Sequence, residues 1–226
     1  MKVTRFAPSP TGNLHIGGVR TALFNYVFSK QSSGLFLIRI EDTDGERSKK
    51  EYEEDIISGL EWLGISPDKT LIRQSERSDV YQQAAKKLTN SGNAYWCDCS
   101  PEELEEMREQ QAAAGKKPMY DGRSRNLGLE RSSKTVLRLK TPIEGETVVR
   151  DLIRGEITFK NSELDDLILL RSDGTPTYHF CNVVDDFDQG VTTVIRGEDH
   201  ISNTPRQFHI QKALGYPDLE LSLIHI

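Results

Sequence analysis

Residues 6–20 read FAPSPTGNLHIGGVR, a loop rich in proline and glycine that runs into a helix. A short apolar segment, Val3–Ala7, precedes it, and a second one, Leu35–Ile40, follows the helix; both suit buried parallel strands. The helix is predicted from apolar residues at helical spacing, and Gly34 suits its end. These residues are Val19, Leu23, Phe24, Val27 and Phe28. The order strand, loop, helix, strand predicts a right-handed crossover unit.

The same loop is a candidate phosphate site, because it ends where the helix begins. Free amides and the positive end of a helix attract phosphate, and Gly17 and Gly18 let a ligand approach the backbone closely. His15 can donate a hydrogen bond to a phosphate oxygen. Position alone leaves a second interpretation open, in which His15 is a turn histidine satisfied by the backbone.

The rest of the chain predicts a discontinuous α/β domain. A second helix is expected over residues 48–63. After residue 91 the pattern changes to an acidic helix (101–114), a loop and alternating β-like runs, and an α/β rhythm resumes at Tyr178. The predicted fold is α/β, a Rossmann-type doubly wound parallel sheet interrupted by an α+β insertion. The expected segments are 1–80 for the first half of the sheet domain, 81–177 for the insertion and 178–226 for the second half.

Composition excludes a general attraction to polyanions. The 226 residues include 29 Lys and Arg against 35 Asp and Glu, a net charge of -6. A local basic segment, 116–140, is the exception. The chain shows neither a signal peptide nor an apolar run long enough to span a bilayer, and its three cysteines suggest no disulfide framework. We therefore expect a cytoplasmic protein that does not bind membranes.

Several stretches together resemble a known family. They are RFAPSPTGNLHIGGVRTALFN at 5–25, IEDTD at 40–44, YDGRSR at 120–125 and the run from Asp173 to Gln207. These strings resemble the glutamyl-tRNA synthetases, which are class I aminoacyl-tRNA synthetases, and the resemblance covers almost the whole chain. The HIGH signature of that class is here HIGG, with Gly18 in the last place, a variant familiar in the family. This variant puts the contact with ATP mostly on His15.

The resemblance implies a set of site residues. The glutamate-binding positions are Arg5, Ala7, Ser9, Glu41, Tyr178, Asn182 and Arg196. The ATP-binding positions are Thr11, His15, Gly17, Gly18 and Glu198, of which His15, Gly17 and Gly18 are the catalytic ones. Guanidinium groups bind carboxylates through paired hydrogen bonds, and a carboxylate suits an ammonium group, so the residue types fit glutamate. Without the resemblance, Arg5 could be a surface charge on an edge strand and Tyr178 a core aromatic.

The resemblance also implies the reaction and the partners. L-Glutamate would attack the α-phosphorus of ATP to give glutamyl-adenylate, and the terminal ribose of tRNA(Glu) would then take the glutamyl group. Mg²⁺ would arrive with ATP. The insertion would contact the tRNA acceptor stem, and for that reason we favour RNA contact over a merely solvated surface for the basic segment.

Zinc is not expected, although some family members hold it in the insertion. Cys97 and Cys99 match the first two ligands, but Ser124 replaces the third cysteine and Asn126 follows where a fourth ligand would lie. Serine and asparagine are poor zinc ligands. The third cysteine, Cys181, suits packing better than nucleophilic chemistry.

The C-terminal sequence predicts a truncated chain. The lysine-rich KMSKS-type loop and the anticodon-reading region of the family are missing, and LSLIHI at 221–226 is an apolar run that we expect to be open and foreign. Two alternative functions therefore stay open: a non-catalytic fragment that binds acceptor RNA, and a glutamyl-queuosine tRNA(Asp) synthetase. The RTALFN continuation after HIGG favours the tRNA-charging enzyme. A nicotinamide dehydrogenase is not expected, because the first loop lacks G-x-G-x-x-G.

Overall fold

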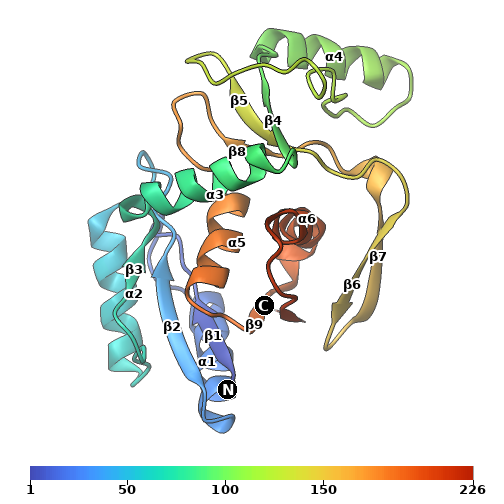
Figure 1. Cartoon of the computed structure of the whole chain (residues 1–226). Helices are drawn as coiled ribbons and strands as arrows, with labels where there is room; N and C mark the ends of the chain where they lie inside the picture. The colour runs from blue at the N-terminus through green and yellow to red at the C-terminus, as the bar shows by residue number, and fades with distance from the viewer. Residues whose placement is uncertain (226) are drawn as a thin grey trace.

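The computed structural model of the chain describes residues 1–225 and begins with a parallel sheet (Figure 1). Strands β1 (Val3–Phe6), β2 (Leu35–Ile40) and β3 (Ile72–Arg73) pair in parallel in the order β1-β2-β3. Helix α1 (Ile16–Gln31) connects β1 to β2, and α2 (Lys50–Trp62) lies between β2 and β3. The strand, loop, helix, strand unit expected from residues 3–40 is confirmed.

Two further parallel strands continue this sheet beyond β1. The C-terminal elements are α5 (Tyr178–Asp188), β9 (Thr193–Gly197), α6 (Thr204–Leu214) and β10 (Glu220–Ile224). β9 lies against β1, where the N–H of Thr192 donates to the carbonyl of Val3 at 2.9 Å, and β10 pairs in parallel with β9. The spatial order β3-β2-β1-β9-β10, with helices between the strands, is the predicted doubly wound arrangement, although hydrogen bonding divides it into the sheets β1-β2-β3 and β7-β6-β10-β9.

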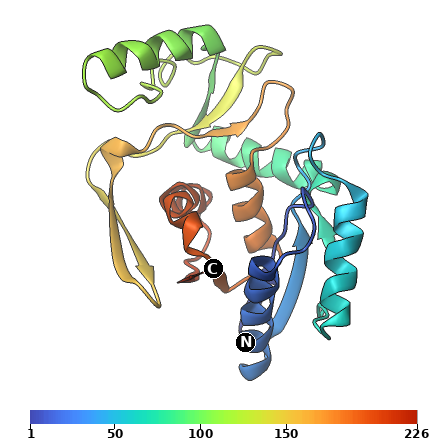
Figure 2. The same cartoon turned by 180° about the vertical axis from the view of Figure 1, so that it is seen from behind.

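Alternation along the first two strands sends successive side chains to opposite faces of the sheet. Phe6, Phe36 and Ile38 pack in one cluster with residues of α1 and α2. Arg5 and Arg39 point the other way, toward α5. Figures 1 and 2 show α1 and α5 on opposite sides of these strands. Two buried arginines thus face α5 because side chains alternate between the two faces of each strand.

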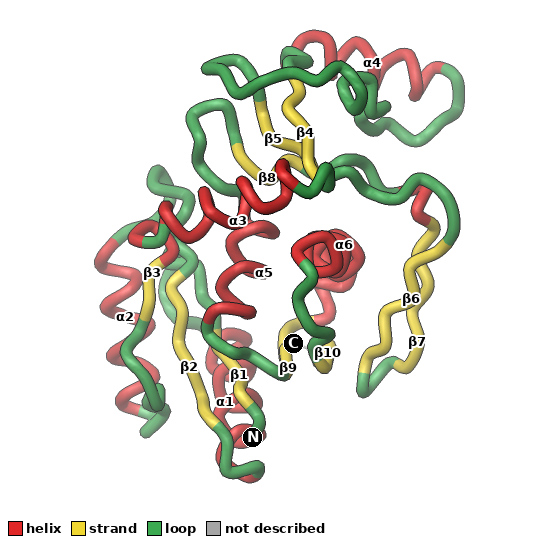
Figure 3. The backbone as a smooth tube through the Cα atoms, in the orientation of Figure 1, coloured by secondary structure: helices red, strands yellow, loops and turns green. Residues whose placement is uncertain are grey.

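Part of the segment between β3 and α5 forms a second layer, made of β4 (Ala94–Cys97), β5 (Val136–Leu139), β8 (Ile168–Leu170) and α4 (Pro101–Ala113) and drawn at the top of Figure 3. An antiparallel sheet joins β4, β5 and β8, and α4 lies beside it. The acidic helix begins at Pro101 because Ser100 and Glu103 form a capping box. Among residues 1–225 no helix combines the length and apolar content needed to cross a bilayer.

Two elements tie this layer to the parallel sheet domain. Helix α3 (Ser78–Asn90) packs its buried side chains in one core with residues of β5, β8, α5 and α6. The hairpin of β6 (Glu146–Asp151) and β7 (Gly155–Lys160) reaches β10 through one parallel pair, Leu221 with Asp151. Short 3₁₀ helices lie at Gln74–Glu76, Asn161–Glu163 and Glu198–Asn203. The division at residues 80 and 177 stays a prediction, because the core runs across both points.

The buried face of α1 differs from the one that the apolar spacing indicates. Ala22, Asn25 and Ser29 are buried, whereas Leu23, Phe24 and Val27 are each more than 40 % exposed. Asn25 fixes the orientation: its side-chain N–H donates to the carbonyl of Ile195 at 3.0 Å, and its backbone carbonyl accepts from the Thr4 hydroxyl. Hydrogen bonds to two strands thus outweigh the burial of larger apolar side chains.

The C-terminal run also differs from expectation. Residues 221–224 are buried within β10, between β9 and β6, so the run is not open as the sequence suggested. The idea that these residues are foreign to the chain stays a prediction. Residue 226 lies outside the described part.

Candidate active site

His15 begins α1 and already makes one hydrogen bond there. Its Nδ1 accepts from the backbone N–H of Gly18 at 3.4 Å, so the ring is the N-terminal cap of the helix. A neutral imidazole that accepts at Nδ1 carries its proton at Nε2, which leaves that N–H free to donate. The two interpretations of His15 from sequence are therefore compatible: the backbone holds the ring, and the ring still offers a donor.

Arg5 and Glu41 lie at the carboxyl ends of β1 and β2. Arg5 is 5 % exposed and Glu41 is 6 % exposed, which is rare for charged side chains unless they are paired. Arg39 is wholly buried beside them, and its Nη2 donates to Glu41 Oε1 at 3.2 Å. Burial raises the pKa of Glu41 to about 7, even though Arg39 and Arg5 oppose this shift.

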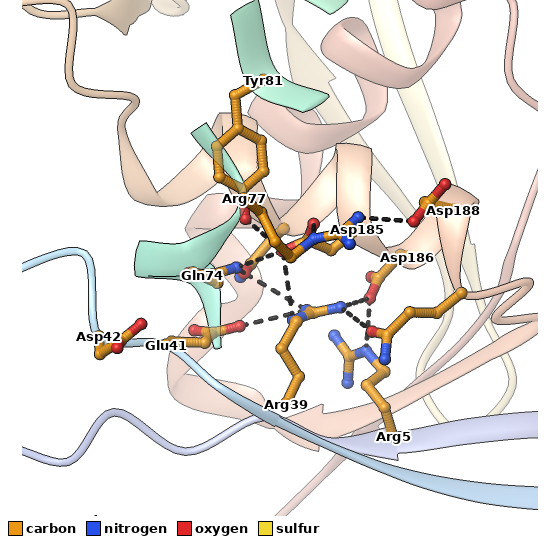
Figure 4. Close-up of polar contacts among 12 residues, drawn as sticks. Arg5, Arg39, Glu41, Asp42, Gln74, Arg77, Tyr81, Asp185, Asp186 and Asp188 are labelled. Carbon is orange, nitrogen blue, oxygen red and sulfur yellow. Dashed lines mark hydrogen bonds and ion pairs between the residues drawn. The ribbon is translucent and has the colours of Figure 1, made fainter. Parts of the chain in front are cut away.

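Helix α5 contributes a column of polar residues one turn apart. Tyr178, Asn182 and Asp186 follow at intervals of four, so they share one face of the helix. Asp186 Oδ1 accepts from Arg5 Nε at 3.0 Å and from Arg39 Nη1 at 2.6 Å (Figure 4). The strands and the helix are therefore joined by buried charges as well as by apolar packing.

Arg196, in β9, is a buried cation without a carboxylate partner among residues 1–225. Its Nη2 donates to Thr204 Oγ1 at 2.8 Å, its Nη1 donates to Gln207, and its Nε makes no hydrogen bond. Burial and the neighbouring Arg5 lower the pKa of Arg196. Such a group favours an anionic ligand, because a carboxylate would supply the missing counter-charge.

A cavity of about 410 Å³ brings most of the predicted residues together, and its volume is typical of small-molecule sites. Its lining includes Arg5, Ala7, Ser9, Thr11, His15, Gly17, Gly18, Glu41, Tyr178, Asn182 and Arg196. The loop at 6–20, the arginines Arg5 and Arg196, and two residues of the α5 column, Tyr178 and Asn182, thus face one space. A second, more apolar cavity of about 710 Å³ lies between β6 and α6; of the predicted site residues, only Arg196 lines it.

Glu198 is the exception among the predicted residues. It does not line the smaller cavity, and its carboxylate pairs with Arg154 and lies 3.9 Å from His225. The next two residues, Asp199 and His200, line the cavity instead. Burial lowers the pKa of His200, as do Arg196 and Arg5, whereas Asp199 raises it.

Arg39 and Asp186 are residues that the sequence analysis missed. Arg39 is the one charge in the apolar strand LFLIRI, and Asp186 lies four residues beyond Asn182 on the same face of α5. A charged residue in a buried strand requires a partner, and that rule could have identified the first. The helical spacing could have identified the second.

The cysteine pair lies in the second layer, away from this cavity. Cys97 Sγ is 3.3 Å from the Tyr120 hydroxyl and 3.6 Å from Ser124 Oγ, and all three side chains are buried. Burial raises the pKa of Cys97, but hydrogen bonds with Tyr120 and Ser124, together with those of Cys99 and Arg138, outweigh burial and lower the pKa overall. Within residues 1–225 no three His, Cys, Asp or Glu side chains are grouped as metal ligands.

The basic segment divides into structural and exposed residues. Arg138 is 3 % exposed and its guanidinium lies 3.9 Å from the centre of the Tyr120 ring. Arg125 binds the Asp166 carboxylate, with Nε to Oδ2 at 2.5 Å. These two arginines hold the second layer together and are not free for RNA. The exposed cations Lys116, Lys134 and Lys140 can still meet a polyanion.

A doubly wound sheet with a glycine-rich loop at the first helix and charged side chains at the strand ends is typical of the proteins that bind nucleotides. The sequence family described as tRNA synthetases class I (E and Q), catalytic domain, matches residues 2–224. The chain belongs to this family.

Curated relatives are similar along most of this chain. A glutamate–tRNA ligase from Thermodesulfovibrio yellowstonii is 57 % identical over 211 residues, which cover 93 % of this chain and 45 % of that protein. One from Nitrosospira multiformis is 55 % identical over 216 residues, covering 95 % of this chain and 46 % of the relative. The chain thus spans about half the length of the curated relatives it matches.

Solved structures agree with this family. A glutamate tRNA ligase from Elizabethkingia meningosepticum, in complex with its amino acid, has a TM-score of 0.90 and 35 % identity, covering the whole of this chain and 49 % of that one. A glutamate-tRNA synthetase from Elizabethkingia anophelis has the same score and identity, and 50 % of it is covered.

Proposed function

We propose that this chain is part of a catalytic domain that ligates L-glutamate to tRNA(Glu) with ATP. The observation that carries the proposal is the meeting of Arg5, Arg196 and Glu41 in one cavity with the start of α1. Within the cavity Arg5 and Arg196 supply two guanidinium groups, and Glu41 supplies a carboxylate. L-Glutamate has two carboxylates and one ammonium group, so its charged groups are complementary to these three side chains.

The proposed roles follow from these charges. Arg5 and Arg196 bind the side-chain carboxylate, Glu41 binds the ammonium group, and Tyr178 and Asn182 line the same wall. The α-carboxylate is then free to attack the α-phosphorus of ATP, forming the acyl-phosphate bond as pyrophosphate departs. In the second step the terminal ribose hydroxyl of tRNA(Glu) attacks the carbonyl carbon, and AMP leaves. No protein nucleophile is required.

The loop would bind the nucleotide through Thr11, Gly17, Gly18 and the Nε2–H of His15. Mg²⁺ belongs to the ATP substrate and would neutralise phosphate charge. The carboxylate of Glu41 is already bound by Arg39, so it suits the ammonium group better than the metal. Glu198 stays a candidate nucleotide contact, although its carboxylate lies beside Arg154. Charging of tRNA would take place in the cytoplasm.

The test is pyrophosphate exchange into ATP, with L-glutamate and tRNA(Glu) each added and omitted. Exchange that requires glutamate supports the proposal, and Arg196→Gln should abolish it. Since the chain spans about half of its relatives, a second candidate is a fragment that binds acceptor RNA without catalysis. Binding of tRNA(Glu) without exchange or glutamate binding would favour the fragment.

A further inference from the structure

Arg39 and Asp186 form a buried ion pair directly behind the wall of the candidate active site. Arg39 is 0 % exposed and Asp186 is 6 % exposed, and neither lines the smaller cavity. Figure 4 shows the Arg39 guanidinium between Glu41 and Asp186. Because neither side chain lines the cavity, the pair can act on a ligand there only through its charges or through the residues that it holds in place.

The pair contacts three cavity residues at once. Asp186 Oδ1 binds Arg5 Nε at 3.0 Å and Arg39 Nη1 at 2.6 Å. Arg39 Nη2 in turn donates to Glu41 Oε1 at 3.2 Å and to Asn182 Oδ1 at 3.4 Å. The side chains proposed for the two ends of glutamate therefore share one buried support.

The geometry at Arg5 shows what this support achieves. Arg5 uses its Nε for Asp186, and its two terminal nitrogens make no hydrogen bond within residues 1–225. A guanidinium is planar, so fixing Nε fixes the direction of the terminal N–H groups. Those groups are the ones that bind a carboxylate through paired hydrogen bonds.

Fold stability alone is a weak explanation for the pair. Desolvation of buried charges offsets most of their attraction, and apolar residues of similar volume are often equally stable in their place. A requirement for fixed geometry explains charged residues better. Arg39 is further confined by Gln189 Oε1 at 3.1 Å and by Asp185 at 3.9 Å.

We propose that Arg39 and Asp186 are positioning residues that set the preference for glutamate over glutamine by holding Arg5 and Glu41 in place. This inference rests on the proposed function. An electrostatic role alone has the opposite sign, because removing the Asp186 carboxylate leaves more positive charge beside the cavity and should strengthen glutamate binding. A loss of glutamate affinity therefore indicates lost orientation.

The test compares L-glutamate and L-glutamine binding by calorimetry in the full 226-residue chain and in Asp186→Asn. We expect glutamate affinity to fall about ten- to a hundredfold, the worth of one hydrogen bond to a charged group, while glutamine affinity changes much less. A double variant, Arg39→Met with Asp186→Leu, replaces both charges by apolar side chains. It should show the same loss of preference, and it carries the test if Asp186→Asn does not fold.

Asp166→Asn is the matched control, because Asp166 is a buried carboxylate that binds an arginine, Arg125, in the second layer. It should lower the unfolding temperature without changing the ratio of glutamate to glutamine affinity. An unchanged ratio in folded Asp186→Asn, or in the double variant, overturns the inference and leaves the proposed function intact. Failure of the parent chain to bind glutamate would overturn both.

Discussion

The pKa of Glu41 lies close to neutral because burial opposes its charge more strongly than Arg39 and Arg5 favour it. Asp186 also raises the pKa of Glu41. The side chains of Tyr178, Cys181 and Arg196 interact electrostatically with the Glu41 carboxylate. Since the pKa is raised to about 7, the group is protonated at lower pH and cannot pair with an ammonium ion.

Glutamate affinity should therefore rise as pH increases from 6 to 8. The expected change is about tenfold per pH unit below the pKa and little above it. Binding should release protons near pH 7, measurable by calorimetry in buffers of different ionisation enthalpy. Glu41→Gln should bind weakly with a flat pH profile, and a steep profile in that variant would assign the effect to another group.

His15 combines a structural and a proposed catalytic function in one ring. His15→Asn should retain the helix cap, because asparagine caps well, while it loses the outward Nε2 donor. We expect it to keep the unfolding temperature and to bind ATP about tenfold or more weakly. His15→Ala should lose both properties, with about 1 kcal/mol less stability. Equal ATP binding in all three proteins would remove His15 from the nucleotide site.

At the scale of elements, Gly34 sets how closely β2 approaches β1. A Cβ built there would lie 1.9 Å from the carbonyl oxygen of Lys2, and that same oxygen accepts the N–H of Leu35. The atoms that the added Cβ would meet belong to the backbone of Lys2, so no flexible side chain could move aside. The left-handed residue at the end of α1 is Ser33, with φ of 49°, so the glycine that the sequence suggests as a helix stop is required by strand pairing instead.

Gly34→Ala should accordingly destabilise the chain by about 1–3 kcal/mol or more, measured by urea unfolding. Gly45→Ala is the matched control, because nothing lies within 4 Å of its added Cβ. Gly45→Ala should leave the free energy of unfolding nearly unchanged. Similar losses in both variants would contradict an explanation by close strand approach.

On the scale of the whole molecule, acceptor RNA is expected to meet the exposed cations of the second layer rather than its buried arginines. The combined change of Lys116, Lys134 and Lys140 to Ala should weaken tRNA binding and reduce the salt slope by about one per lost phosphate contact. Lys50→Ala, in α2, is the control. A slope unchanged from the parent chain would place the RNA on another surface.

Family, fold class and most of the cavity lining could be predicted from the sequence, because local patterns encode them. The loop at 6–20 and the strand Leu35–Ile40 are contiguous, and their residue types limit what they can form. The face of α1, the burial of residues 221–224 and the place of Glu198 were not predictable in this way. Each depends on a partner far along the chain, such as Ile195 for Asn25 or Arg154 for Glu198.

The sequence by itself determined which charged and polar side chains are available for the proposed binding of glutamate and ATP. Only the tertiary structure decided that Asp186 holds Arg5 and Arg39 together, and that Arg196 makes no salt bridge within residues 1–225. The physical reason is that pairing of buried charges depends on distance in space, and Arg5 and Asp186 are 181 residues apart in the chain. Strand register and helix packing bring them to 3.0 Å.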